Sequence, residues 1–284
     1  VIDRPARTIG IEPYFMQLVS GIQADLAAHH VLLQFTMTED VDAEIELYRQ
    51  WWAQRRVDGV FVVDLKVDDR RIAVIEKLRM PAVVIGTPRG AGSLPAIWQD
   101  DRAAVDIVVG YLAAQGHRRI ARVGGRATYW HSVLRKDAFA AAAVAAGLTA
   151  FSVEADYSAE HGAQATVGLL GSAEPPSAIL YDNDVMAAAG LGVAQRLGVS
   201  VPDGVSVVSW DDSALCELMH PALTALRRDI AGAGSTAARM LRELAAGGRP
   251  ESVQEATPVL QTRMSSGWAG VPEVQAPGRS RLTA

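Results

Sequence analysis

Apolar positions along the chain follow two periods, one typical of helices and one typical of buried strands. The first helical stretch places its apolar residues at i, i+3, i+4, i+7 and i+11, and these are Phe15, Leu18, Val19, Ile22 and Leu26. Residues 59–63 and 82–85 are apolar at consecutive positions instead. Such runs are typical of strands that are covered on both faces of a parallel sheet. The pattern predicts helices alternating with parallel strands.

The same alternation continues through the second half of the chain. Strands are predicted at residues 120–123, 178–181 and 205–210. The predicted helices between and around them are residues 101–115, 131–146, 159–170 and 184–197. Alternation of this kind implies βαβ units, and the strands are too many for one small sheet. We therefore predict an α/β fold with two doubly wound parallel-sheet lobes.

The C-terminal part has a different pattern. A strand is possible at residues 223–227, a helix is predicted at 231–246, and Gly247 to Pro250 provide residues that end helices. Residues 253–263 are predicted to be extended. From Trp268 onward the chain is rich in Gly, Pro, Ser and Arg without periodicity, so residues 268–284 are predicted to be a flexible tail.

Composition narrows the class of protein. The 284 residues are 49% hydrophobic and 21% charged, with a net charge of −5, which is typical of a globular protein and disfavours nucleic-acid binding by this chain alone. No apolar run is long enough to span a membrane, and no secretion signal opens the chain. The single cysteine, Cys216, excludes an internal disulfide. We expect a cytoplasmic protein without a membrane partner.

The chain lacks the motifs that most enzymes and cofactor-binding proteins carry. It has no G-x-G-x-x-G, no G-x-x-x-x-G-K-[ST], no G-x-S-x-G and no H-E-x-x-H. Its six histidines lack metal-ligand spacing. We expect no catalytic residue, no metal and no cofactor. An enzyme, such as a nucleoside or sugar hydrolase, remains an alternative.

Polar side chains follow several predicted strands. Asp64 follows one strand, Asn183 a second and Asp211 a third, and Arg135 lies early in a predicted helix. Ligands of open α/β sheets bind beyond the carboxyl ends of the strands. Aromatic residues occur in the same loops, including Tyr14, Phe15, Trp130, Tyr157 and Trp210. Aromatic faces beside charged hydrogen-bonding groups suit a polyol, although any one of these residues taken alone is more often a helix cap or a surface residue.

At these positions the sequence resembles the effector-binding core of LacI/GalR-family transcription regulators. The resemblance covers residues 1–265 in order. Its motifs are Pro13-Tyr14-Phe15, Val57-Asp58-Gly59-Val60, Pro81 to Ile85, Asp100-Asp101-Arg102, Gly116 to Ala121, Arg135 with Phe139, Tyr181 to Ala187, Val207 to Asp212, and His220 to Thr224. Ala138 stands where the family usually has glycine, and Gly86 where many sugar-responsive members have an acid.

The resemblance implies a type I periplasmic-binding-protein fold, in which two lobes joined by three hinge crossings close on a small molecule, usually a sugar. Residues 1–125 with 228–249 would form one lobe, and residues 126–227 with 250–267 the other. Arg135, Asn183 and Asp211 would contact the effector, while Tyr14, Phe15 and Tyr157 would line the cleft. Because of Gly86 we expect a cleft that is wider or more aromatic at that position, and the identity of the effector stays open.

The resemblance also implies partners. Such regulators are homodimers that bind operator DNA through an N-terminal helix-turn-helix headpiece, which these 284 residues do not contain. Trp51, Trp52 and Ile72 are large apolar residues on otherwise polar helices, so we expect residues 40–55 and 68–79 to form much of the dimer interface. The rival interpretation, an extracytoplasmic solute receptor of a sugar transporter, shares the fold, and the regulator-like motifs from Gly198 to Thr224 disfavour it.

Overall fold

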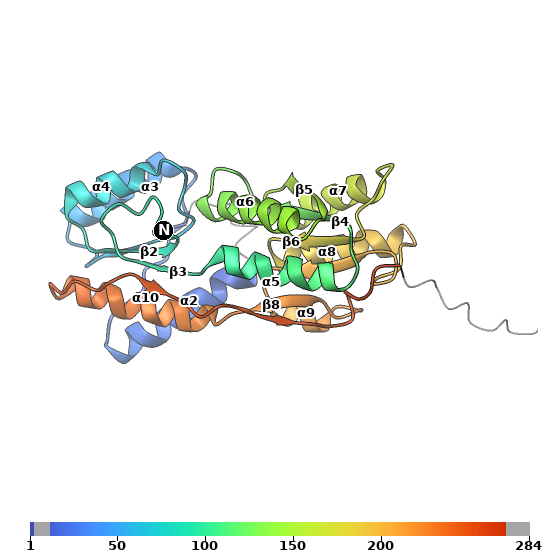
Figure 1. Ribbon diagram of the computed structural model, residues 1–284. Coiled ribbons are helices and arrows are strands. Elements are labelled where there is room, and N and C mark those ends of the chain that lie inside the picture. The colour runs from blue at the N-terminus through green and yellow to red at the C-terminus, as the bar shows by residue number, and fades with distance from the viewer. Residues whose placement is uncertain (3–11, 271–284) are drawn as a thin grey trace, which may run out of the picture.

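The computed structural model describes residues 1–2 and 12–270 and shows two α/β lobes side by side (Figure 1). The helices are α2 (Pro13–Ala28), α3 (Val41–Ala53), α4 (Arg70–Leu78), α5 (Asp101–Ala114), α6 (Trp130–Ala145), α7 (Ala159–Leu170), α8 (Asp184–Arg196), α9 (Ala214–Leu218) and α10 (Ile230–Ala245). The strands are β1 (Val60–Val62), β2 (Ala82–Gly86), β3 (Ala96–Trp98), β4 (Arg119–Gly124), β5 (Thr149–Glu154), β6 (Ala178–Tyr181), β7 (Ser206–Ser209), β8 (Thr224–Arg227), β9 (Val253–Gln254) and β10 (Val259–Gln261).

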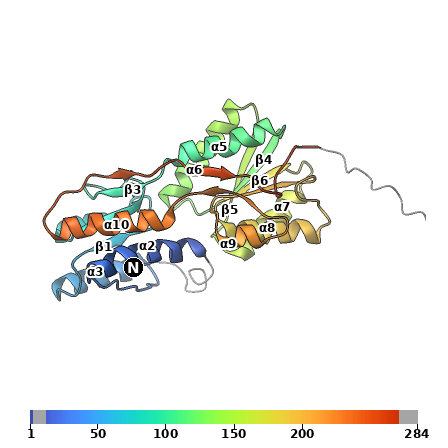
Figure 2. The same ribbon diagram turned by 90° about the horizontal axis from the view of Figure 1, so that it is seen from below.

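The first lobe is a parallel sheet of order β1-β2-β3-β9 with helices α2 and α10 packed together against it. The two helices lie side by side in both views (Figure 2). They approach closely because glycines meet backbone at the contact. A Cβ on Gly21 would lie 1.9 Å from the carbonyl oxygen of Ala231, and one on Gly234 would lie 2.4 Å from that of Leu18. Any side chain at either glycine would force the helices apart.

The second lobe is a six-stranded sheet of order β10-β8-β7-β6-β4-β5, parallel except for β10 at one edge. Strands β6 and β7 are buried along their whole length, as expected for central strands with helices on both faces. The predicted α/β class with two parallel-sheet lobes is confirmed. Strand β5 was missed in the sequence, because it lies at the sheet edge and most of its residues are only half-buried.

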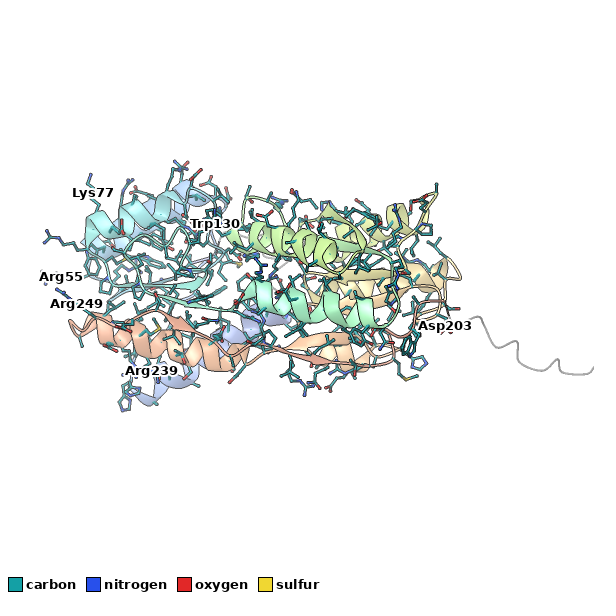
Figure 3. All side chains as sticks on the ribbon, viewed as in Figure 1. Arg55, Lys77, Trp130, Asp203, Arg239 and Arg249 are labelled. Atoms are coloured by element: carbon teal, nitrogen blue, oxygen red, sulfur yellow. The ribbon has the colours of Figure 1, made fainter. Side chains whose placement is uncertain are left out.

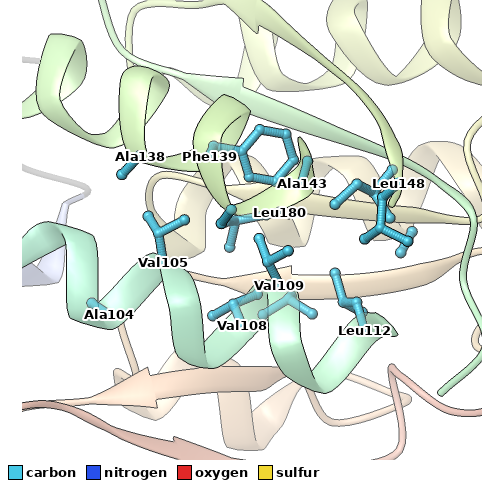
Figure 4. Close-up of a cluster of buried hydrophobic side chains, with 14 of the residues drawn as sticks. Ala104, Val105, Val108, Val109, Leu112, Ala138, Phe139, Ala143, Leu148 and Leu180 are labelled. Carbon is cyan, nitrogen blue, oxygen red and sulfur yellow. The ribbon is translucent and has the colours of Figure 1, made fainter. Parts of the chain in front are cut away.

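Helix α5 and strand β4 belong to the second lobe, not to the first as the boundary at residue 125 implied. The apolar face of α5 packs on α6 and the six-stranded sheet (Figure 4), through Val105, Val108, Val109 and Leu112 against Phe139 and Leu180. Helical periodicity shows which residues of α5 are buried but not against which sheet they pack. In the other direction, β9 joins the first lobe, although residues 250–267 were assigned to the second.

The chain crosses between the lobes three times, at residues 99–100, 228–229 and 255–258. The first two crossings are short because a capped helix begins immediately after each. Asp100 accepts a hydrogen bond from the backbone N–H of Ala103 at 3.0 Å, and Asp229 accepts one from Gly232 at 2.8 Å. The crossings therefore hold their residues close to both lobes.

Helices α3 and α4 are joined by a buried ion cluster. The Arg71 guanidinium is 1% exposed and donates to both carboxylate oxygens of Glu44 at 3.1 Å and to Asp69 at 2.7 Å. The Tyr48 hydroxyl also donates to Glu44. Every charge in the cluster is paired, as burial requires.

The structure contradicts the argument that placed the dimer interface on these helices. Trp51 and Ile72 are buried within the chain, and Trp52 packs against the core between β1, β2, α3 and α4. These apolar groups are explained by packing inside the lobe, so they do not indicate a partner surface. Homodimerisation stays a prediction of the family resemblance alone.

The structure bears on the predicted absence of a membrane span and on the predicted C-terminal tail. None of the helices within residues 1–2 and 12–270 has the length and apolarity needed to cross a bilayer. Of the predicted flexible tail, residues 271–284 lie outside the described residues.

A substitution of Phe139 tests the packing described for the hydrophobic core of the second lobe. The Phe139 side chain is 1% exposed among α5, α6 and the six-stranded sheet, so we expect Phe139→Ala to lower the free energy of unfolding by about 3–5 kcal/mol. The measurement is urea unfolding followed by circular dichroism. Val144→Ala on the same helix is the control, because Val144 is 80% exposed. A Phe139→Ala loss no larger than that of the control would contradict this packing.

A polar cavity at the three crossings

Two hollows differ sharply in chemistry. The larger, of about 2200 Å³ with its open solvent, runs along the first lobe between α2, residues 31–35 and β1, and most of its lining is apolar. The smaller, of about 830 Å³ counted in the same way, lies between the lobes and is lined by charged and aromatic side chains from both. Specific small-molecule sites combine apolar walls with convergent polar groups. The inter-lobe cavity is therefore the candidate site.

Each of the three crossings contributes a polar residue to this cavity. These residues are Gln99, Arg228 and Glu255. The Arg228 guanidinium donates to the Gln99 side-chain carbonyl at 3.3 Å, and the backbone N–H of Glu255 donates to the carbonyl of Trp98 at 2.8 Å. Sequence reasoning missed all three. Gln99 and Glu255 follow β3 and β9, which the sequence did not reveal as strands, whereas Arg228 directly follows the possible strand at residues 223–227 and was overlooked. The available signals were the aromatic Trp98 beside Gln99 and the position of Arg228 at the end of a possible strand.

Arg228 connects the two lobes. It donates two hydrogen bonds to Oδ1 of Asp211, at 2.6 and 3.2 Å, at the end of β7. Its guanidinium also lies 5.0 Å from the ring centre of Tyr14, at the start of α2 in the first lobe. Burial lowers the pKa of Arg228, but the negative charge of Asp211, Tyr14 and the hydrogen bonds to Asp211 together leave it raised. Arg228 is thus a permanent cation held by both lobes.

Arg135 reaches the cavity from α6. It donates to Asp101 at 3.0 Å, and its guanidinium lies 4.0 Å above the ring centre of Trp210. Trp210 is fully buried and does not line the cavity. The structure therefore places Trp210 beneath Arg135 and outside the lining of the cavity.

Asn183 also lies behind the cavity wall. Its side-chain oxygen accepts from the backbone N–H of Met186 at 2.9 Å and so caps α8, while its Nδ2 donates to the carbonyl of Tyr157 at 3.0 Å. Tyr157 itself lines the cavity, with its hydroxyl 2.9 Å from Ser132 Oγ and 2.6 Å from His131 Nε2. The helix-cap alternative holds for Asn183, which positions the Tyr157 loop.

Of the three remaining aromatic residues predicted for the site, one lines the cavity and two do not. Tyr14 lines the cavity, and burial raises its pKa to about 12, so the phenol stays neutral. Phe15 instead points into the first core, where it packs edge-on against Tyr14 at 5.2 Å. Trp130 lies at the first turn of α6, close to the first lobe (Figure 3), and stacks under Arg89 at 4.4 Å. Neither Phe15 nor Trp130 lines the cavity.

Five of the nine predicted residues are thus brought together around the cavity: Tyr14, Asp64, Arg135, Tyr157 and Asp211. Gly86 also lines it, and a Cβ added there would meet nothing within 4 Å, which supports the expected extra width. Among the described residues no group of three His, Cys, Asp or Glu could hold a metal ion.

Asp184 is a buried carboxyl group directly behind the site. Burial and the neighbouring charge of Asp211 raise its pKa to about 6. Its Oδ2 accepts from the Ser213 hydroxyl, while Oδ1 is buried without a hydrogen-bond partner in the described part of the chain. Asp184 is therefore protonated more readily than an exposed aspartate.

Two sheets joined by three crossings, with a polar cavity at the crossings, define a two-lobed α/β binding protein. Residues 109–266 match the model of the periplasmic binding protein-like domain. A LacI family transcriptional regulator from Bifidobacterium animalis subsp. lactis has a similar structure, with a TM-score of 0.86 and 36% identity over 90% of this chain and 95% of that one. The chain belongs to the LacI family of transcriptional regulators.

Other proteins similar to this chain at lower identity are also regulators or control proteins. The HTH-type transcriptional repressor PurR of Erwinia tasmaniensis is 27% identical over 91% of this chain and 80% of its own length. Catabolite control protein A of Priestia megaterium is 25% identical over 80% of this chain and 70% of its own. The complex of the transcriptional regulator CelR with cellobiose has a TM-score of 0.85 at 25% identity, covering 93% of this chain and 83% of that one.

Asp184 predicts a pH dependence of stability. A carboxyl group whose pKa is raised on folding binds its proton more tightly in the folded state, so its contribution to stability is lost as the pH rises from about 4 to about 6. Asp184→Asn removes this loss, and its amide oxygen can still accept from Ser213. We expect the variant to gain on the order of 1–2 kcal/mol relative to wild type between pH 4.5 and pH 7.

Urea unfolding at the two pH values measures this difference. Asp203→Asn, at an exposed aspartate at the far end of the second lobe (Figure 3), should show no such change. An Asp184→Asn difference that is equal at both pH values would contradict the assignment.

Proposed function

We propose that this chain is the effector-sensing and dimerisation core of a cytoplasmic transcriptional repressor, which closes its two lobes on a sugar or sugar derivative. Binding would alter operator DNA affinity through a helix-turn-helix headpiece. The observation that carries the proposal is that all three crossings supply side chains to one polar cavity. A ligand there contacts the segments about which the lobes would rotate, so binding biases their relative orientation.

The cavity chemistry supports a polyhydroxylated ligand. Tyr14, Tyr157 and Trp98 provide ring surfaces, and charged groups surround them. Sugars are bound by such combinations, with apolar ring faces against aromatic groups and hydroxyls bonded to charged side chains. CelR, which shares the fold, has been seen with cellobiose, and this supports a carbohydrate here without naming it.

The named relatives also bear on the rival interpretations. PurR is a transcriptional repressor, and the 36% identical structure is that of a LacI family transcriptional regulator. They favour a regulator over a solute receptor of a transporter and over an enzyme. Homodimerisation rests on the family resemblance, and its test is the molar mass in solution by light scattering at micromolar concentration, where a monomer would contradict it.

A thermal-shift screen tests the effector site. The panel is D-glucose, D-galactose, D-ribose, cellobiose, maltose and adenosine. A ligand present at about 100 times its Kd adds about 2.7 kcal/mol, and this should raise Tm by a few degrees in a protein of this size. We expect a selective rise with one class of sugar.

Asp211→Asn is expected to abolish the rise of Tm that the sugar causes, because Asp211 lines the cavity. Asp203→Asn should leave that rise unchanged. The asparagine keeps a hydrogen-bonding group beside Arg228. Asp211→Ala would be a poorer test, because Asp211 is 6% exposed and ion-paired, so removal of its carboxylate would also destabilise the fold. Binding unaffected by Asp211→Asn, or no response to any sugar, would contradict the proposal.

A further inference from the structure

We propose that the cavity selects an uncharged or positively charged polyhydroxylated ligand, a free sugar or an amino sugar, and excludes phosphorylated and carboxylated ones. This inference rests on the proposed role of the cavity as the effector site. It narrows the ligand by charge, which neither the fold nor the relatives specify.

Carboxyl groups outnumber cations around the cavity. The carboxyl groups that line it are those of Glu12, Asp64, Asp101, Asp182, Asp211 and Glu255. The guanidinium groups that the described residues bring to this lining are those of Arg135 and Arg228, and His131 is the one other basic side chain among them. Within the described part of this lining, carboxyl groups therefore outnumber the cations that could hold an anion.

Both guanidinium groups are already paired inside the protein. Arg135 is held by Asp101 at 3.0 Å and Arg228 by Asp211 at 2.6 Å. Asp182 is paired in turn with Arg122, which donates to it at 2.8 Å. A phosphate would lose its hydration without gaining an unpaired cation, which is unfavourable in a partly buried site. The arginines of this cavity are thus not an anion-binding pair.

Glu255 is a carboxyl group of the cavity lining that has no cationic partner in the described part of the chain. It lies on the third crossing, and its side chain makes no ion pair with any residue within 12–270. Burial raises its pKa, and the charge of nearby Arg228 lowers it in part. A ligand hydroxyl or ammonium group would supply the hydrogen-bond donor that this carboxylate lacks.

Gln99 is oriented to complement such a hydroxyl. Its carbonyl oxygen accepts from Arg228 at 3.3 Å, which fixes the direction of the amide. Its Nε2 is buried without a hydrogen-bond acceptor in the described part of the chain. Gln99 and Glu255 thus offer one donor and one acceptor at neighbouring crossings, which matches a hydroxyl group and not a phosphate.

Inorganic phosphate tests the charge claim without knowledge of the effector. In HEPES at pH 7 and constant ionic strength, phosphate should change the Tm of wild type no more than sodium chloride does. Asp101→Asn/Asp211→Asn releases both arginines and should bind phosphate at least tenfold more tightly, with a saturable rise of Tm. Asp137→Asn/Asp203→Asn removes the same charge from exposed positions and should behave as wild type.

Glu255→Gln breaks no ion pair and serves if the double variant fails to fold, as judged by circular dichroism. It should strengthen phosphate binding over wild type, although by less than the double variant. Saturable binding of phosphate to wild type would overturn the inference. So would the absence of any gain in the folded variants.

Matched sugars separate this inference from the proposed function. D-glucose, D-glucosamine and D-glucose 6-phosphate differ in one group, as do the corresponding galactose compounds. A larger Tm rise with a phosphorylated sugar than with its free form would overturn the charge claim and leave the effector site standing. No response to any free or amino sugar would count against the sugar part of the proposed function, and the phosphate titration would then decide the charge claim by itself.

Discussion

The ion pair between Arg228 and Asp211 is the interaction on which the site depends. It joins the second crossing to the end of β7 at 2.6 Å, and the same guanidinium lies over Tyr14 of the first lobe. A buried ion pair adds little net stability, but removing one partner is costly because a charge is left unpaired. Its importance here is geometric, since it fixes the second crossing against both lobes.

The other contacts of the cavity follow from this arrangement. Arg228 orients Gln99 on the first crossing, and its charge offsets part of the rise that burial causes in the pKa of Glu255 on the third. A ligand that engages these side chains would therefore act on all three crossings at once. This gives a physical route from ligand binding to lobe orientation that needs no long chain of intermediate residues.

The sequence was sufficient for the layers of the fold but not for their assignment to lobes. Consecutive apolar residues predicted β2, β6 and β7, and the period of 3.6 predicted α2 and α5. The partner of α5 was wrong, because its apolar stripe fits either sheet and only the packing with Phe139 and Leu180 decides. Short strands such as β3 and β9 carry too few residues to show a period.

The site was predicted in part for a similar reason. Residues at strand ends were correctly expected to converge, and Asp64 and Asp211 do so. The sequence does not show which way a side chain points, so Asn183 and Trp210 were placed in the cavity although they lie behind it. Gln99 and Glu255 were missed because crossings are set by how the lobes pair, which no local pattern encodes. Arg228 follows a possible strand, but nothing in the sequence showed that this strand ends at a crossing.

Hydrogen–deuterium exchange tests the central claim most directly, with the panel sugar that raises Tm most. The account predicts slower amide exchange at all three crossings, in peptides that cover residues 98–101, 227–230 and 254–257. Exchange in the apolar hollow along α2 and residues 31–35 should not change. Protection confined to that hollow, or to one lobe without the crossings, would contradict it.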